Sequence, residues 1–258
     1  MSSFDPLDRF RLDGRVAIVT GASAGLGARF ARVLDAAGAS VVLAARRVDR
    51  LEALAAELRD AHPVSVDLGE SGATTRLVDA TLERFDRIDV VVNNAGVDHI
   101  EPATEQPLET FRRELEVNLV APFDLSRLAA RWMIEAGVEG SIVNVASVWA
   151  LVGLGQIPDA GYAASKAGLV NMTRELAAQW ARRGVRVNAL APGWFRSEMT
   201  EGLMFGDERG ERWMRQRTPM GRGGAEHELD GALLFLATEA SSFVTGAVLP
   251  VDGGWTAI

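Results

Sequence analysis

Tyr162 and Lys166 are the two residues of this chain whose types and spacing best suit acid–base chemistry. They lie in the run Tyr162-Ala163-Ala164-Ser165-Lys166, and on a helix this spacing puts both side chains on one face. A neighbouring ammonium favours the phenolate, so we expect Lys166 to lower the pKa of Tyr162. Such a tyrosine could exchange a proton with a substrate oxygen. The same pair also occurs on solvated helices without any chemical role, so the other motifs decide its meaning.

A glycine-rich loop, Thr20–Gly27, follows an apolar run and precedes a helical pattern. Its glycines allow a tight turn and a close backbone approach to a pyrophosphate, while the helix N-terminus offers free N–H groups. An ordinary βα turn can look the same, but the position of this loop in a βαβ unit favours a dinucleotide site. The loop residues expected to contact the cofactor are Gly21, Ser23, Ala24, Gly25, Leu26 and Gly27.

The residues after the second apolar run bear on which nucleotide binds. An acidic residue at this place would hold a ribose 2′-hydroxyl, but the chain has Ala45 followed by Arg46 and Arg47. A guanidinium pairs well with a 2′-phosphate. We therefore expect NADP(H) to be preferred, with NAD(H) as the second choice. The alternative is that both arginines are solvated and either nucleotide binds.

Composition narrows the class of protein. The 258 residues are 48% hydrophobic and carry a net charge of −8, which argues against nucleic acid as a partner. The absence of cysteine excludes disulfides and thiolate metal sites, and the three histidines show no metal-ligand spacing. The N-terminus has no secretory apolar stretch, and no segment is long and apolar enough to span a membrane. A cytoplasmic enzyme without a metal or a membrane partner is expected.

Short β-branched runs alternate with longer amphipathic segments along the whole chain. The expected strands are Val16–Thr20, Ser40–Ala44, Pro63–Val66, Ile88–Val92, Ser141–Ala146, Val185–Leu190 and Val248–Val251. This alternation implies an α/β fold with right-handed crossovers and a parallel sheet. We expect one domain over residues 1–258, with a loose arm at residues 1–11. Residues 194–224 interrupt the alternation and are expected to form a helical lid over the sheet.

The motifs together resemble the short-chain dehydrogenase/reductase family, including its 3-oxoacyl-[acyl-carrier-protein] reductase-like members. The resemblance runs from about Arg11 to Gly254, and the motifs follow the order of the family. They are Thr20–Gly27, Asp67-Leu68, Asn93–Gly96, Asn118, Ser147, Tyr162–Lys166, Pro192-Gly193 and Val251–Gly254. The resemblance implies a Rossmann-type doubly wound sheet of seven parallel strands in the order 3-2-1-4-5-6-7, with helices on both faces.

The resemblance also implies a role for each matching residue. Asn118, Ser147, Tyr162 and Lys166 match the catalytic tetrad. The other expected cofactor contacts are Asp67 and Leu68 at the adenine, Asn94, Ala95 and Gly96 at the ribose, and Pro192, Gly193 and Ser197 at the nicotinamide. Ser197 stands where the family often has threonine, and its hydroxyl is expected to contact the nicotinamide amide.

In the implied reaction a ketone is reduced to a secondary alcohol, or the reverse. Tyr162 is the expected general acid and Ser147 the second donor to the reacting oxygen. Lys166 is expected to hydrogen-bond the nicotinamide ribose, and Asn118 to hold a water that connects Lys166 to bulk solvent. The resemblance further implies a homotetramer, built by packing two long helices and the C-terminal edge.

Apolar residues near these motifs suggest the substrate. The expected pocket is formed by Trp149, Leu151, Trp194, Phe195, Met199 and Leu203, with Met204, Phe205 and Trp213 as further candidates. They predict a small, largely apolar carbonyl or alcohol substrate, although any of them could instead be core or a subunit contact.

Two other functions stay open. Arg131 and Arg174 could contact an acidic carrier protein, which would suit a 3-oxoacyl thioester reductase, or could form ordinary surface salt bridges. A nucleotide-sensing protein without turnover is the alternative from another class, and an intact tetrad argues against it.

Overall fold

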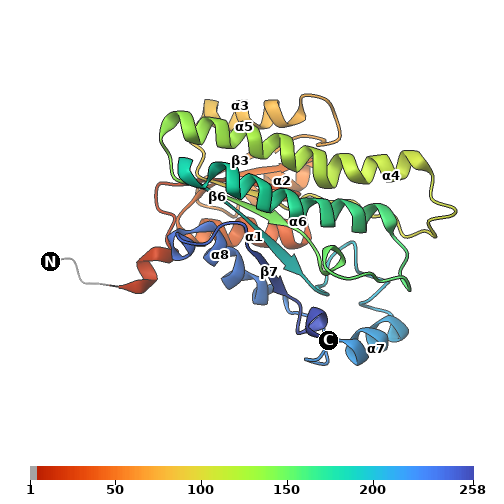
Figure 1. Ribbon diagram of the computed structural model, residues 1–258. Helices are drawn as coiled ribbons and strands as arrows, with labels where there is room; N and C mark the ends of the chain where they lie inside the picture. Colours follow the sequence, from red (N-terminus) through yellow and green to blue (C-terminus); the bar gives the residue numbers. More distant parts are fainter. Residues whose placement is uncertain (1–4) are drawn as a thin grey trace.

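The computed structural model describes residues 5–258 and contains one parallel sheet of seven strands (Figure 1). The strands are β1 (Val16–Thr20), β2 (Ser40–Ala45), β3 (Ala61–Ser65), β4 (Val90–Asn93), β5 (Gly140–Val145), β6 (Val185–Pro192) and β7 (Val248–Val251). Their order in the sheet is β3-β2-β1-β4-β5-β6-β7, which confirms the predicted topology. The order reverses between β1 and β4, and this is where an open α/β sheet leaves a crevice for a ligand.

Two layers of helices cover the sheet. The helices are α1 (Gly25–Ala37), α2 (Val48–Ala55), α3 (Ala73–Phe85), α4 (Leu108–Leu115), α5 (Ala121–Ala136), α6 (Ala160–Trp180), α7 (Glu208–Arg217) and α8 (Asp230–Ala237). One apolar core lies between the sheet and α1, α2 and α8, and a second core lies between the sheet and α3, α5 and α6. Figure 1 shows α3, α5 and α6 above the sheet and α1 and α8 below it.

The apolar runs form strands because both faces of the sheet are covered. In β1 every residue is buried, and successive side chains enter different cores. Ala17 and Val19 pack with α1, whereas Val16 and Ile18 pack with α5. A strand of alternating polarity would leave one of these helical layers without an apolar partner.

The strand limits differ from expectation most clearly in β3 and β4. The strand β3 begins at Ala61, two residues before the expected start, and includes Pro63. Because β3 is at the edge of the sheet, a proline that lacks a backbone N–H is tolerated there. The strand β4 begins at Val90, after Ile88 and Asp89.

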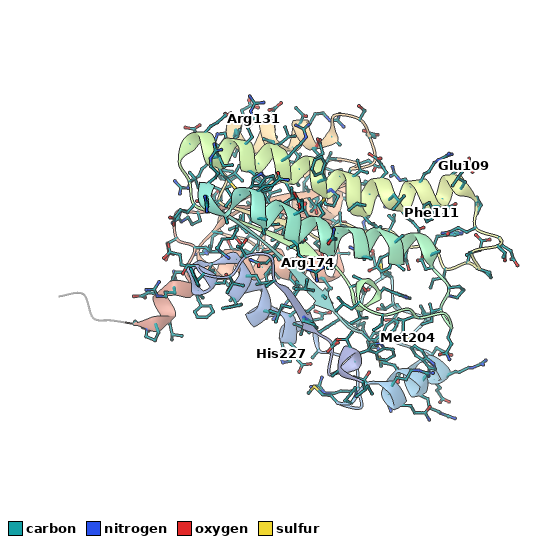
Figure 2. The ribbon with its side chains drawn as sticks, in the orientation of Figure 1. Glu109, Phe111, Arg131, Arg174, Met204 and His227 are labelled. Carbon is teal, nitrogen blue, oxygen red and sulfur yellow. The ribbon has the colours of Figure 1, made fainter. Side chains whose placement is uncertain are left out.

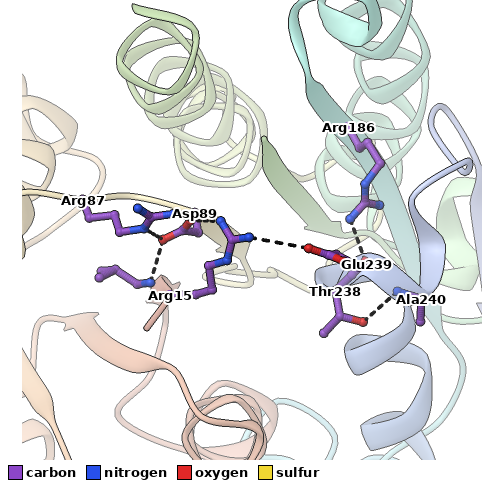
Figure 3. A network of polar contacts seen from close by, with 8 residues as sticks. Arg15, Arg87, Asp89, Arg186, Thr238, Glu239 and Ala240 are labelled. Carbon is purple, nitrogen blue, oxygen red and sulfur yellow. Dashed lines mark hydrogen bonds and ion pairs between the residues drawn. The ribbon is translucent and has the colours of Figure 1, made fainter. Parts of the chain in front are cut away.

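Asp89 holds the amino-terminal edge of the sheet together (Figure 3). Its buried carboxylate accepts hydrogen bonds from the Val16 backbone N–H at 2.9 Å and from the side chains of Arg15 and Arg87 at 2.9 and 2.7 Å. Arg15 also pairs with Glu239, beyond α8, at 3.6 Å. A buried carboxylate needs such partners, and here they join β1 and β4 to the loop after α8.

The expected loose arm at residues 1–11 differs from the structure. Residues 1–4 lie outside the described part of the chain, but Pro6–Phe10 forms a 3₁₀ turn. Asp5 caps this turn by accepting a hydrogen bond from the Leu7 backbone N–H, and Leu12 is buried. A proline at the first helical position and an aspartate before it form an N-terminal capping signal that favours this turn. Within residues 5–258, no helix is long and apolar enough to cross a membrane.

Candidate active site

A cavity of about 520 Å³ opens at the carboxyl ends of β1, β2, β4, β5 and β6. Every residue predicted to contact the cofactor lines it, from the loop at Gly21 to Ser197 beyond β6. Ser147, Tyr162 and Lys166 of the predicted tetrad also line it, whereas Asn118 lies behind the wall. The cavity therefore extends from the glycine-rich loop after β1, which we call the nucleotide end, to Tyr162, which we call the substrate end.

The glycine-rich loop is fixed to the end of β4. The Thr20 hydroxyl accepts hydrogen bonds from the backbone N–H groups of Asn94 and Ala95 at 2.9 and 3.0 Å, and the Asn94 amide donates to the Thr20 carbonyl oxygen at 2.9 Å. A Cβ on Gly27 would lie 2.2 Å from the Gly21 carbonyl oxygen, so the turn requires glycine there. Ala24 precedes α1 without a side-chain cap, which leaves the first N–H groups of the helix available to an anion.

Arg47 lies at the place where a ribose 2′-phosphate is expected. Its guanidinium donates to the Ser23 hydroxyl at 3.1 and 3.0 Å and forms an ion pair with Glu198 at 2.9 Å. Arg50 also pairs with Glu198, at 2.6 Å. Hydrogen bonds from Arg47 and Arg50 lower the pKa of Glu198 to about 2. Arg46 lies next to this cluster, is exposed and lines the cavity.

Asp67, expected at the adenine, also has a partner within the chain. Its carboxylate accepts hydrogen bonds from Arg113 at 2.8 and 3.0 Å and from the Gly69 backbone N–H at 2.9 Å. Burial raises the pKa of Asp67, but these hydrogen bonds outweigh burial and the net pKa is lowered. The carboxylate keeps lone pairs for an adenine amine, so this assignment stays a prediction.

Helix α6 carries Tyr162 and Lys166 into the cavity. Asp159 caps the helix by accepting a hydrogen bond from the Tyr162 backbone N–H at 2.9 Å. The Lys166 Nζ lies 5.6 Å from the centroid of the Tyr162 ring and donates to the Val145 carbonyl oxygen at 2.7 Å. Ser147 follows β5 and lines the same cavity as Tyr162, and its hydroxyl accepts a hydrogen bond from the Trp149 backbone N–H at 3.2 Å. Ser147, Tyr162 and Lys166 thus face one cavity, with the ammonium beside the tyrosine ring.

Burial has the largest effect on the pKa values of Tyr162 and Lys166. It raises the pKa of Tyr162 well above the ordinary value, and the hydrogen bond from Ser147 only partly offsets it, while Asp98 and Asp159 raise it further. Burial also lowers the pKa of Lys166 to about 8. The expectation that Lys166 lowers the pKa of Tyr162 is therefore wrong for this structure. The physical reason is that both groups are removed from water, which disfavours the charged form of each.

Asn118 lies in a π-helical turn, Glu116–Val120, between α4 and α5. Its side-chain oxygen accepts a hydrogen bond from the Val97 backbone N–H at 2.8 Å, and its amide donates to the Val97 carbonyl oxygen at 2.8 Å and to the Ser165 hydroxyl at 3.1 Å. The amide therefore fixes the chain after β4, where a Cβ on Gly96 would lie 3.7 Å from the Lys166 Nζ. The expected water at Asn118 stays a prediction.

The end of the cavity beside Tyr162 is mostly aromatic and apolar. Five of the six predicted pocket residues line it, namely Trp149, Trp194, Phe195, Met199 and Leu203. Leu151 does not: it follows the 3₁₀ turn Val148–Ala150 and is 37% exposed, so its assignment to the pocket is wrong. The ring centroid of Trp149 lies 5.3 Å from that of Tyr162 and 5.6 Å from that of Trp194.

The predicted lid region, residues 194–224, packs on these rings. Trp194 contacts Trp213 of α7 and Trp255 edge to face, at centroid distances of 5.9 and 5.5 Å. Met204, Phe205 and Trp213 belong to the apolar cluster behind the cavity rather than to its wall. These three pocket candidates are therefore core residues, which was the alternative to a place in the pocket. The role of the segment as a lid stays a prediction.

Sequence reasoning missed four polar residues that line the cavity, namely Asp98, Arg113, Glu198 and Thr200. Asp98 follows the Asn93–Gly96 motif by two residues, and this position was the one signal that could have identified it. Glu198 and Thr200 lie next to the predicted residues Ser197 and Met199, whereas Arg113 reaches the cavity from α4. Arg131 and Arg174, the candidate carrier contacts, are exposed on α5 and α6 (Figure 2). Arg131 forms an ion pair with Glu135 one turn away, at 3.0 Å, as in the ordinary surface interpretation.

Comparison with known proteins gives matches along nearly the whole chain. Residues 21–256 match the family described as Enoyl-(Acyl carrier protein) reductase. The chain is 41% identical to galactitol 2-dehydrogenase (L-tagatose-forming) of Cereibacter sphaeroides over 249 residues, which cover 96% of this chain and 97% of that protein. It is 40% identical to gluconate 5-dehydrogenase of Gluconobacter oxydans over 258 residues, covering 96% and 97%.

Among solved structures, a gluconate 5-dehydrogenase from Burkholderia cenocepacia in complex with NADP and tartrate superposes with a TM-score of 0.92. It is 37% identical, and the match covers 98% of this chain and 100% of that one. Because sequence and fold agree over the same extent as the motifs, the chain belongs to the short-chain dehydrogenase/reductase family, the NAD(P)-dependent oxidoreductases that interconvert alcohols and carbonyl compounds.

Proposed function

We propose that this protein interconverts a ketone and a secondary alcohol with NADP(H), and that Tyr162 transfers the proton. The observation that carries the proposal is that Ser147, Tyr162 and Lys166 line one cavity together with the glycine-rich loop and the apolar residues. One end has the glycine loop and arginines that suit a dinucleotide, and the other has an apolar wall that suits a substrate.

The cofactor, when bound, supplies or accepts the hydride at its nicotinamide. The residues of the chain bind and orient the substrate and transfer the proton. Tyr162, whose pKa is raised by burial, holds its proton at neutral pH and donates it to the substrate oxygen in the reduction direction. Ser147 offers a second hydrogen bond to the same oxygen, and donors aimed at a developing negative charge lower the barrier. Lys166, whose Nζ is buried beside Tyr162, is positioned to bind the nicotinamide ribose.

The preference for NADP(H) is supported by Arg46 and Arg47 at the cavity wall, where the Ser23 hydroxyl already orients Arg47. The gluconate 5-dehydrogenase structure with NADP is consistent with it. Arg46→Ala should lower kcat/KM for NADPH by roughly tenfold, the value of one charge-assisted contact, and leave that for NADH unchanged. Equal losses with the two nucleotides would contradict a contact with the 2′-phosphate.

The substrate proposed here is small and largely apolar, because Trp149, Trp194, Met199 and Leu203 form most of its end of the cavity. A homotetramer is also proposed. Val120 and Phe123, near the start of the long helix α5, are more than 40% exposed, as an apolar subunit contact would require in a single copy. Sedimentation at micromolar concentration would test it, and a stable monomer would refute it. The cytoplasmic location stays a prediction that cell fractionation would check.

The test of the function is Tyr162→Phe. The substitution removes one hydroxyl from a buried ring that packs against Trp149, so the fold and the nucleotide end should stay intact. We expect kcat for ketone reduction to fall by at least about 100-fold, as for loss of a general acid, with the NADPH dissociation constant within twofold of wild type. Substantial remaining turnover would remove Tyr162 from the role of proton donor.

A further inference from the structure

Asp98 places a carboxylate in the wall of the cavity, beside the proposed proton donor. It follows β4 and the Asn93–Gly96 motif, and it lines the same cavity as Ser147, Trp149 and Tyr162. The next residue, His99, donates its backbone N–H to the Asp159 carboxylate at 3.1 Å, and the same carboxylate accepts from the Tyr162 backbone N–H at 2.9 Å, which holds Asp98 near the start of α6. Asp98 therefore faces the end of the cavity where the substrate is expected.

This carboxylate has almost no partner in the chain. Among residues 5–258, its only hydrogen-bond donor is its own backbone N–H. The neighbouring ionisable groups are Asp159, which raises the pKa of Asp98, and His99, which lowers it. His99 itself points its ring to Glu101, at 3.0 Å. Asp98 is thus a partly buried anion whose oxygens remain available to a ligand.

The positive charges of the cavity lie elsewhere. Arg46, Arg47 and Arg113 line the nucleotide end, and the last two already pair with Glu198 and Asp67. Lys166 is the remaining cation of the wall, and its Nζ donates to the Val145 carbonyl oxygen below the ring of Tyr162. The substrate end therefore carries one negative charge and no exposed positive charge among the residues that the structure describes.

We propose that Asp98 makes this enzyme select uncharged substrates that carry a hydroxyl group next to the reacting carbon, and reject substrates that carry a carboxylate. The proposal rests on the function proposed above, since it concerns the same site. A hydroxyl next to the reacting carbon donates a hydrogen bond to Asp98. This bond replaces the water that Asp98 loses when the substrate binds. A substrate carboxylate would instead lie against a like charge in a cavity that screens charges poorly.

The relatives that match this chain differ in this property. Galactitol is an uncharged polyol, whereas gluconate carries a carboxylate. Overall identity does not separate them, because the chain is 41% and 40% identical to the two enzymes. The negative charge of Asp98 at the cavity wall favours the uncharged class of substrate for this protein. The aromatic wall of Trp149 and Trp194 then packs on the carbon faces of the same molecule.

The experiment compares matched pairs of ligands in wild type and Asp98→Asn. One pair is galactitol and gluconate in the oxidation direction, and the other is methyl acetoacetate and acetoacetate in the reduction direction. We expect wild-type kcat/KM to favour the uncharged member by about 100-fold, the effect of two like charges roughly 6 Å apart at an effective dielectric constant near 20. In Asp98→Asn, which keeps shape and removes charge, the ratio should fall at least tenfold.

Two further variants complete the test. Glu101→Gln removes a nearby negative charge that does not line the cavity, and its ratio should equal that of wild type. Asp98→Ala, which removes the hydrogen-bond acceptor, should abolish any preference for trans-1,2-cyclohexanediol over cyclohexanol. Equal wild-type rates for both members of a pair, or a ratio unchanged in Asp98→Asn, would overturn the proposal.

Binding separates this proposal from the proposed function. The dissociation constants are measured calorimetrically, for the alcohols with the protein saturated in NADPH and for the carbonyl compounds with the protein saturated in NADP⁺, because no hydride can be transferred in these complexes. Absence of turnover with a retained, Asp98-dependent preference for uncharged ligands would refute the catalytic proposal alone. Turnover without such a preference would refute the role of Asp98 alone.

Discussion

Glu114 of α4 is a buried acid whose ionisation should cost stability as the pH rises. Its side chain is 1% exposed and lies under the first turn of α6, where a Cβ on Gly161 would be 1.8 Å from Oε2. Oε2 accepts a hydrogen bond from Gln106 at 2.9 Å, while Oε1 has no partner among the described residues. Burial, and then the charge of Asp159, raise the pKa of Glu114 from 4.5 to about 8.

The sign of the effect follows from proton uptake. Below the unfolded pKa of 4.5 both states carry the proton, and the acid costs nothing. Between pH 4.5 and about 8 the unfolded chain loses the proton while the folded chain keeps it, so stability falls as the pH rises. Above that range both states are ionised and the loss is complete. Linkage gives a total of roughly 5 kcal/mol for this change of pKa.

Glu114→Gln removes this dependence. The oxygen of a glutamine can accept a hydrogen bond from Gln106 as Glu114 does, but a glutamine does not ionise. The measured quantity is the difference in free energy of unfolding, variant minus wild type. We expect this difference to increase by at least about 2 kcal/mol between pH 5 and 9. Urea unfolding at fixed protein concentration measures this difference at each pH.

The matched control is Glu109→Gln, on the exposed side of the same helix (Figure 2). It removes the same charge where water screens it, so its difference from wild type should stay flat with pH. Parallel pH curves for wild type and Glu114→Gln would refute the reasoning. They would mean that Glu114 is ionised in the folded protein near neutral pH, with water or a partner at Oε1.

The remaining predictions concern the cavity. Glu198→Gln should lower the NADPH dissociation constant by up to roughly fivefold by calorimetry and leave that of NADH unchanged, because an exposed ion pair with Arg47 is worth at most about 1 kcal/mol. An unchanged NADPH constant would mean that Glu198 does not compete for Arg47. Trp194→Ala should raise KM for bulky ketones more than for small ones in steady-state assays, and equal increases would remove Trp194 from the pocket. Alcohol oxidation needs the Tyr162 phenolate, whose pKa burial raises, so kcat/KM for oxidation should rise from pH 7 to 9 while that for reduction does not; an oxidation optimum below pH 7 would contradict this.

The parts of the fold that sequence predicted are those that backbone geometry and burial dictate locally. The apolar run of β1 had to be a strand covered on both faces, because its residues enter both cores. The glycine loop was predictable because its geometry excludes a side chain at Gly27. Most predicted cofactor contacts line the cavity because they follow the ends of parallel strands that meet at one edge, whereas Tyr162 and Lys166 reach it from α6.

What the sequence could not predict depends on segments that meet only in the folded chain. Arg47 pairs with Glu198, 151 residues away, and Asp67 pairs with Arg113, 46 residues away. No spacing rule joins such residues. The prediction for Leu151 was wrong for a related reason. An apolar side chain is equally compatible with the core and with a pocket wall, and only the turn at Val148–Ala150 decides that Leu151 faces outward.

The pKa of Tyr162 depends on more than the spacing of residues in the sequence. The spacing of Tyr162 and Lys166 was sufficient to place an ammonium beside the ring, at 5.6 Å. The pKa depends in addition on how much water both groups lose, and that loss is set by β5, α6 and the tryptophans around them. Because burial disfavours phenolate and ammonium alike, the pair is held as a neutral tyrosine beside a weakly basic lysine. A charge that enters the cavity next to them therefore shifts their protonation more than it would shift that of a solvated pair.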